Sequence, residues 1–193
     1  ENHLADAGYR VILCNSEDHP EQEKRYLDML FANQVDGIIT GAHSDALVNV
    51  PHAQAPLVTV DRRETGFYPN IRSDNYGGAH AATEHLIATG AQTIVHVTST
   101  LGEHNERQRG YREAMLDTGL TPEFVELGFR PSLGLKREML YRYLDERADS
   151  AEPVDAVFAS NDNYAALALG WARTRGIRVP EDFQVIGYDG TQT

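Results

Sequence analysis

The sequence predicts an α/β protein built from parallel, doubly wound sheets. Short apolar, β-branched runs recur along the chain, and longer segments with helical periodicity lie between them. Most of the short runs are apolar at nearly every position, which is typical of strands covered on both faces. Strands that alternate with helices form parallel sheets with right-handed crossovers.

The individual elements follow in chain order. Leu4 and Ala5, followed by Gly8, are typical of the tail of a helix, and the chain stops shortly after a strand, so we expect a fragment trimmed at both ends. The expected strands are Arg10–Cys14, Asp36–Thr40, Leu57–Asp61, Thr93–Thr98, Phe124–Leu127, Ala156–Ser160 and Gln184–Tyr188. The expected helices are Glu21–Asn33, Gly77–Thr89, Asn105–Thr118, Ser132–Arg147 and Asp162–Arg175, several of which end at a glycine.

One segment breaks this alternation and indicates two lobes. Between Arg62 and Gly78 only a short extended piece, Asn70–Ser73, is expected, with no helix before it. We interpret it as a crossover between an incomplete N-terminal lobe, residues 1–72, and a C-terminal lobe, residues 73–189. Residues 190–193 would begin the return crossover. A cleft between two lobes is a preferred site for a small molecule.

Composition excludes several functional classes. The 193 residues carry a net charge of −12, which argues against binding nucleic acid through phosphate contacts. No apolar run is long enough to span a membrane. The lone Cys14 excludes an internal disulfide, favours a reducing compartment, and is expected to be a small core residue rather than a reactive thiol.

Sequence motifs for catalysis and cofactor binding are missing. The chain has no glycine-rich dinucleotide or P-loop signature and no G-x-S-x-G elbow, so neither an enzyme nor a cofactor is predicted. His80 and His85 are five residues apart on a helix and face different directions, so no metal site is predicted. His104 is interpreted as a solvated loop residue.

Polar residues recur at the carboxyl ends of predicted strands, where open α/β sheets bind ligands. They are Asp61, Asn161 with Asp162, and Asp189, with Asp74 and Asn75 after the crossover. Carboxylates and amides in such places suit a ligand rich in hydroxyl groups. The alternative for Asp74, Asn75, Asn161 and Asp162 is a simple helix N-cap.

Two further residues are candidates for the same site. Arg107 lies in the first turn of a helix, where the helix dipole disfavours a cation, and shares a face with Tyr111 and Ala114. This indicates a ligand or a carboxylate partner, with a plain salt bridge to Glu103 as the alternative. Phe129 follows a strand and could stack on a sugar or base; core packing is the alternative.

The order of short motifs resembles the lactose/galactose repressor (LacI/GalR) family of bacterial transcription regulators. The matching segments are Gly8–Asn15, Val35–Ile39, Val60–Arg62, Ser73–Gly78, Glu84–Leu86, Glu106–Ala114, Ala159–Asp162 and Val179–Asp189. Each motif is weak alone, but together they span nearly the whole chain in the family's order. Gly90-Ala91-Gln92 departs from the family's usual Gly-His at a helix end.

The resemblance implies the effector-binding part of such a regulator, with a periplasmic-binding-protein-like fold of two Rossmann-like lobes. It implies a small effector, a sugar or sugar phosphate, held by Asp61, Arg107, Phe129, Asn161, Asp162 and Asp189. It also implies a cytoplasmic homodimer that binds operator DNA through a helix-turn-helix headpiece. The headpiece, the hinge, the first strand and the last elements of the family are not among these residues.

Two other functions remain as alternatives. The first is a sugar-binding protein of a transporter with the same fold, and the second is an enzyme with a doubly wound sheet. The sequence does not identify the effector, since the family also includes purine-sensing members.

Overall fold

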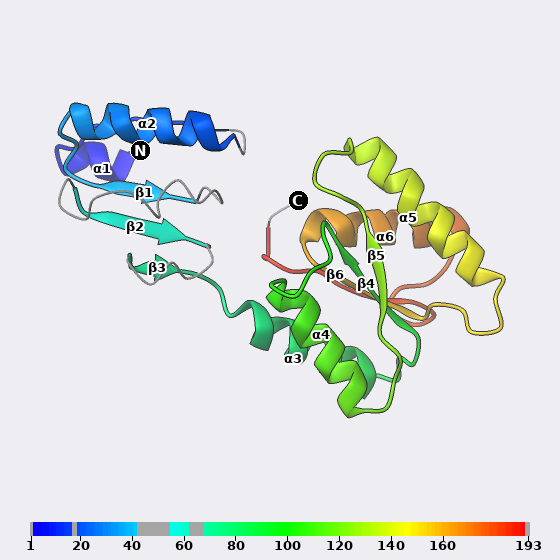
Figure 1. The fold of residues 1–193 in the computed structure, drawn as a ribbon. Helices are drawn as coiled ribbons and strands as arrows, with labels where there is room; N and C mark the ends of the chain where they lie inside the picture. The colour runs from blue at the N-terminus through cyan, green and yellow to red at the C-terminus, as the bar shows by residue number, and fades with distance from the viewer. Residues whose placement is uncertain (1, 17–18, 42–54, 62–67, 192–193) are drawn as a thin grey trace. The chain divides into compact units, whose positions relative to one another are not determined.

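The structure is a computed structural model that describes residues 2–16, 19–41, 55–61 and 68–191 (Figure 1). The chain divides into two compact units, residues 1–73 and 74–193. Residues 62–67 of the expected crossover segment lie outside the described residues, as do residues 192 and 193.

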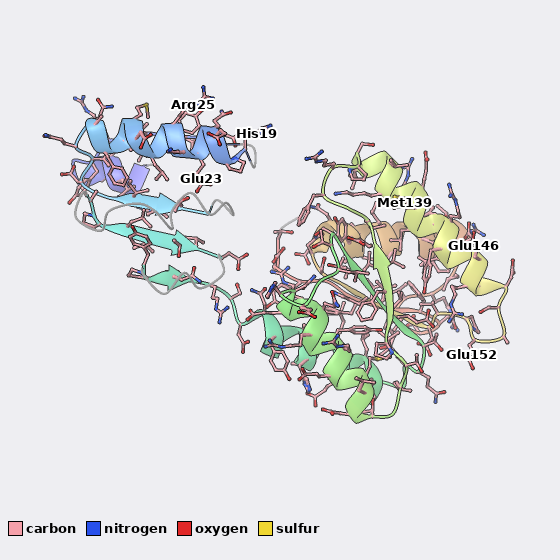
Figure 2. The ribbon with its side chains drawn as sticks, viewed as in Figure 1. His19, Glu23, Arg25, Met139, Glu146 and Glu152 are labelled. Atoms are coloured by element: carbon pink, nitrogen blue, oxygen red, sulfur yellow. The ribbon has the colours of Figure 1, made fainter. Side chains whose placement is uncertain are left out.

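The first unit is a small parallel sheet with helices. It contains α1 (Asn2–Asp6), α2 (Pro20–Ala32), β1 (Ile38–Thr40), β2 (Leu57–Val60) and β3 (Asn70–Ile71), with the strands in the order β1-β2-β3. Leu27 of α2 packs with Ile38 and Leu57 to form its core. Glu23 is buried on the same helix, whereas Arg25 projects into solvent (Figure 2).

The strand expected at Arg10–Cys14 is not formed. Residues 9–16 have no regular secondary structure, and Leu13 is 91% exposed. A strand is stable only when a neighbour satisfies its backbone hydrogen bonds, and in the described sheet β1 pairs with β2 alone. Cys14 is half-buried rather than a core residue.

The second unit alternates helices and strands as predicted. Its elements are α3 (Asn75–Ala88), β4 (Ile94–Thr98), α4 (Glu106–Asp117), β5 (Glu123–Glu126), α5 (Leu133–Ala148), β6 (Ala156–Ala159), α6 (Asp162–Arg175) and β7 (Gln184–Ile186). All strand pairs are parallel, and the strand order is β5-β4-β6-β7. The predicted doubly wound α/β fold is confirmed.

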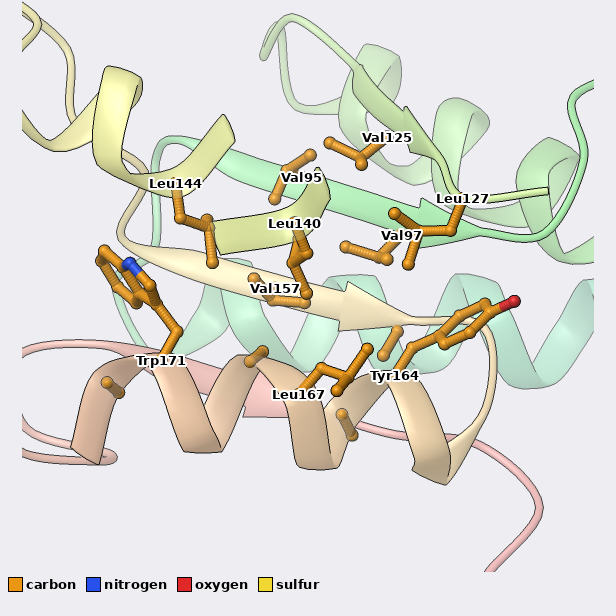
Figure 3. Close-up of a cluster of buried hydrophobic side chains, with 14 of the residues drawn as sticks. Val95, Val97, Val125, Leu127, Leu140, Leu144, Val157, Tyr164, Leu167 and Trp171 are labelled. Carbon is orange, nitrogen blue, oxygen red and sulfur yellow. The ribbon is translucent and has the colours of Figure 1, made fainter. Parts of the chain in front are cut away.

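Each face of this sheet is covered by a pair of helices. On one face Val95 and Val97 of β4 pack with residues of α5 and α6, including Leu140 and Trp171 (Figure 3). On the other face Ile94 packs with residues of α3 and α4. Every residue of β4 is buried, including the polar His96 and Thr98, as expected for a strand covered on both faces.

The topology gathers several chain segments at one edge of the sheet. In a parallel sheet α4, α5 and α6 begin where β4, β5 and β6 end, at the carboxyl edge. Because α3 leads into β4, its first residues lie at this edge too. The chain turns from β4 to β5 on one side and then crosses to β6 on the other. The gap between β4 and β6 is thus the topological switch point, where open α/β sheets bind their ligands.

Candidate functional site

Arg107 forms the centre of a polar cluster at this switch point. Its Nε donates to Asn75 Oδ1 (2.7 Å), its Nη2 pairs with Asp189 Oδ1 (3.1 Å), and its Nη1 donates to the carbonyl oxygen of Ser160. The guanidinium also lies over the ring of Tyr188, 3.8 Å from the centroid. The groups come from α3, the end of β6 and the turn after β7, so Arg107 bridges segments distant in sequence.

The inward orientation predicted for Arg107 from its helical face is therefore confirmed. The Arg107 side chain is 19% exposed and its carboxylate partner is Asp189 rather than Glu103. The pair joins residues 82 positions apart. Asp189 is 41% exposed, so solvent weakens the pair and leaves its carboxylate accessible.

Asn161 and Asp162 have different roles. Asn161 caps α6, because its Oδ1 accepts from the Tyr164 backbone N–H (3.0 Å). Asp162 is the first helical residue, and its Oδ2 accepts from the backbone N–H (2.6 Å) and hydroxyl (2.9 Å) of Thr191. These bonds, the Thr191 backbone bond foremost, lower the pKa of Asp162. The N-cap alternative is thus correct for Asn161 and wrong for Asp162.

Phe129 lies at the same edge, in the loop between β5 and α5. Its side chain is 71% exposed, so the alternative of core packing is wrong. The loop is held by Lys136 of α5, whose Nζ donates to the Phe129 carbonyl and to the Tyr164 hydroxyl, both at 3.3 Å. The structure thus presents an exposed aromatic ring in a loop that is anchored through its backbone.

Asp61 belongs to the first unit. It follows β2, has a positive φ of 50°, and donates its backbone N–H to the carbonyl oxygen of Ile71 (2.8 Å). Its side chain is exposed. The structure therefore places Arg107 and Asp189 in direct contact, with Asn161, Asp162 and Phe129 at the same edge of the sheet. The predicted contact of Asp61 with the effector stays a prediction.

The N-cap alternative is correct for Asp74, which caps α3, and wrong for Asn75, which contacts Arg107. Sequence reasoning missed two further residues at this edge of the sheet. Tyr188 carried no predicted role although it belongs to the Gly-Tyr-Asp motif beside Asp189. Lys136 was also missed; its position near the start of a helix is the same signal that identified Arg107.

His96 of β4 is a buried histidine whose ring stacks on both Tyr111 and Phe158. Its Nδ1 donates to the Phe158 carbonyl oxygen (3.0 Å). Burial lowers the pKa of His96 to about 4, so the imidazole is neutral at physiological pH. Among the described residues no group of three or more His, Cys, Asp or Glu side chains could hold a metal ion.

The described part of the chain contains no helix with both the length and the apolar character needed to cross a bilayer.

Comparison with known proteins identifies the fold family. Residues 83–193 match the family model of the periplasmic binding protein-like domain. The sucrose operon repressor of Pediococcus pentosaceus is 38% identical over 194 residues, covering 99% of this chain and 58% of that protein. The chain thus spans little more than half the length of this relative.

Two solved structures extend the similarity. The first is the periplasmic binding protein/LacI transcriptional regulator of Alkaliphilus metalliredigens complexed with D-xylulofuranose, with a TM-score of 0.75 and 27% identity over 99% of this chain and 70% of that one. The second is a LacI-family regulator of Enterococcus faecium with bound ribose, with a TM-score of 0.76 and 27% identity over 98% and 70%. The chain belongs to the periplasmic binding protein-like domain family and shares its fold with LacI-type transcriptional regulators.

Proposed function

We propose that this chain is the ligand-sensing portion of a LacI-type transcriptional repressor. Its similarity to a sucrose operon repressor and a ribose operon repressor supports this role over that of a transporter's sugar-binding protein. The acidic charge of −12 agrees with DNA contact by a different part of the protein. In this proposal the full-length protein is a cytoplasmic homodimer without enzymatic activity, and a helix-turn-helix headpiece binds the operator.

The proposed effector is a sugar or sugar phosphate bound over the carboxyl edge of the second unit. Arg107 donates to its oxygens, Asp189 and Asn161 accept from its hydroxyl groups, and Phe129 stacks on its ring. The relatives with ribose and D-xylulofuranose support this ligand class. A contact from Asp61, and a location between the two lobes, stay predictions.

The observation that carries the proposal is the position of Arg107. A guanidinium held at the switch point by Asn75, Ser160 and Asp189 is a fixed hydrogen-bond donor at the place where this topology binds ligands. An effector that displaces one of these partners from Arg107 breaks a contact between segments distant in sequence. A ligand shifts the equilibrium between two conformations of a protein only if its affinity for them differs. In this proposal the displaced contact is the source of that difference in affinity.

Calorimetric titration of the full-length protein tests the proposal. The ligands are D-ribose, D-xylulose, sucrose, ribose 5-phosphate and hypoxanthine, the last representing purines. We expect at least one sugar or sugar phosphate to bind, and Arg107→Met to weaken it by about tenfold or more, because hydrogen bonds from a charged donor are lost.

Arg109→Met is the matched control. Arg109 is on the same helix but lies over the ring of Tyr76 and pairs with Glu113, and it shares none of the partners of Arg107 given above. Binding of hypoxanthine alone would replace the sugar proposal with a purine. Equal affinities for wild type and Arg107→Met would remove Arg107 from the site.

A further inference from the structure

The turn after β7 is wrapped around the carboxylate of Asp162. Oδ2 of Asp162 accepts from the backbone N–H and the hydroxyl of Thr191, at 2.6 and 2.9 Å. The backbone N–H groups of Gly190 and Tyr188 also contribute to lowering the pKa of Asp162. Asp189 and Gly190 both have positive φ angles, 96° and 68°, which curl the backbone around the anion.

The fit between carboxylate and turn is close. A Cβ added at Gly187 would collide with Oδ1 of Asp162, so only glycine allows this approach. Thus Gly187, just before the turn, and Thr191, at its end, both meet the same carboxylate. Oδ2 of Asp162 already accepts two hydrogen bonds from Thr191, as many as its two lone pairs allow.

The same turn carries two of the groups that hold Arg107. Asp189 pairs with Nη2 of Arg107, and the Tyr188 ring lies beneath the guanidinium. The Tyr188 hydroxyl donates to the carbonyl oxygen of Asp74 (3.1 Å), which ties the turn to the start of α3. Any loosening of the turn therefore displaces two contacts of Arg107 together.

We propose that Asp162 is a positioning residue: its carboxylate holds the turn of residues 188–191 so that Asp189 and Tyr188 stay on Arg107. It is not an effector ligand itself. The consequence for effector affinity rests on the proposed function, whereas the link between Asp162 and the turn does not. The two statements are tested by separate measurements.

The first measurement uses the full-length protein without ligand. NMR hydrogen exchange of the backbone amides of residues 188–191 and the side-chain Nε–H resonance of Arg107 are compared between wild type and Asp162→Asn. Asparagine keeps the size but replaces one acceptor oxygen by an NH₂ donor. We expect the Thr191 amide to exchange about tenfold faster or more and the Arg107 resonance to shift. An unchanged turn in this variant overturns the proposal.

Asp155→Asn is the matched control for a general loss of stability. Asp155 also accepts two backbone N–H bonds in this unit, from Gln92 (2.8 Å) and Thr93 (3.0 Å), but at the amino end of the sheet. We expect this variant to lower the melting temperature while the Arg107 resonance stays in place. Equal effects of the two variants on that resonance would make Asp162 a purely structural residue and overturn the proposal.

The second measurement is calorimetric titration with D-ribose or whichever panel sugar binds the wild type. We expect Asp162→Asn to weaken binding about tenfold and Asp155→Asn to leave it unchanged. A loosened turn with unchanged affinity would overturn the positioning role. If no tested ligand binds the wild type, the proposed function fails, and the ligand-free measurement still decides whether Asp162 holds the turn.

Discussion

His96 and Arg107 are two basic side chains in the second unit whose environments differ sharply. His96 is completely buried in β4 against the rings of Tyr111 and Phe158, and the cost of burial keeps it neutral. Arg107 lies in α4 at the rim of the sheet, where Asn75, Ser160, Tyr188 and Asp189 surround its guanidinium. One basic group is thus neutralised inside the sheet, whereas the other bridges several chain segments at its edge.

The largest expected effect is the pH dependence of stability that His96 causes. The pKa of His96 is about 4 in the folded protein, below the ordinary value of 6.5. Between these values the unfolded chain binds a proton that the folded one does not, so stability falls as pH decreases through this window and is unaffected above it. The loss is about 3 kcal/mol in total.

Urea unfolding at several pH values measures this loss. His96→Phe keeps an aromatic ring of similar size but cannot titrate, so the difference in unfolding free energy between the variant and the wild type should vary with pH only between 6.5 and about 4. A difference that stays constant across this pH window would mean that burial does not lower the pKa of His96.

The next effect concerns Tyr188, whose ring lies against the guanidinium of Arg107. Tyr188→Leu removes the ring beneath Arg107, whereas Tyr188→Phe keeps the ring and removes only the hydroxyl that donates to Asp74. The ring should contribute about 0.5–2 kcal/mol, taken as the difference in unfolding free energy between the two variants. If leucine and phenylalanine are equivalent here, the ring does not hold the guanidinium.

The smallest effect is expected at the far end of the turn. Thr191→Val keeps the backbone N–H bond to Asp162 and removes the hydroxyl bond. Because Thr191 is exposed, the loss should be about 0.5–1 kcal/mol of unfolding free energy. Thr191→Ser restores the hydroxyl and serves as the control; a serine variant as weak as valine would assign the effect to the lost methyl group.

Local patterns predicted most of the architecture, because buried parallel strands and capped helices leave clear signals. The helix predicted at Asp162–Arg175 has these bounds in the structure, and β4 begins one residue after the predicted start. The run at Arg10–Cys14 has the same local signal and is not a strand. Its failure has a simple cause: strand propensity is local, but the neighbour that stabilises a strand is set by the tertiary structure.

The candidate site was predictable where one residue broke a local rule. Arg107 did so by placing a cation at a helix start, and its inward orientation is confirmed. The functions of Asn75 and Asp162 were not predictable, because a side chain after a strand can cap a helix or reach a distant segment equally well. Asp162 meets Thr191 across 29 residues, a contact that only the fold reveals.

The anchored loop of Phe129 has a practical meaning for biosensor design. It precedes α5, in the layer of α5 and α6, whereas Arg107 begins α4 in the layer on the opposite face of the sheet. Lys136 fixes the loop through the carbonyl group of Phe129 and makes no demand on its ring. If Phe129 stacks on the effector as proposed, ligand preference is open to redesign by varying this side chain alone, while the residues that surround Arg107 are left intact.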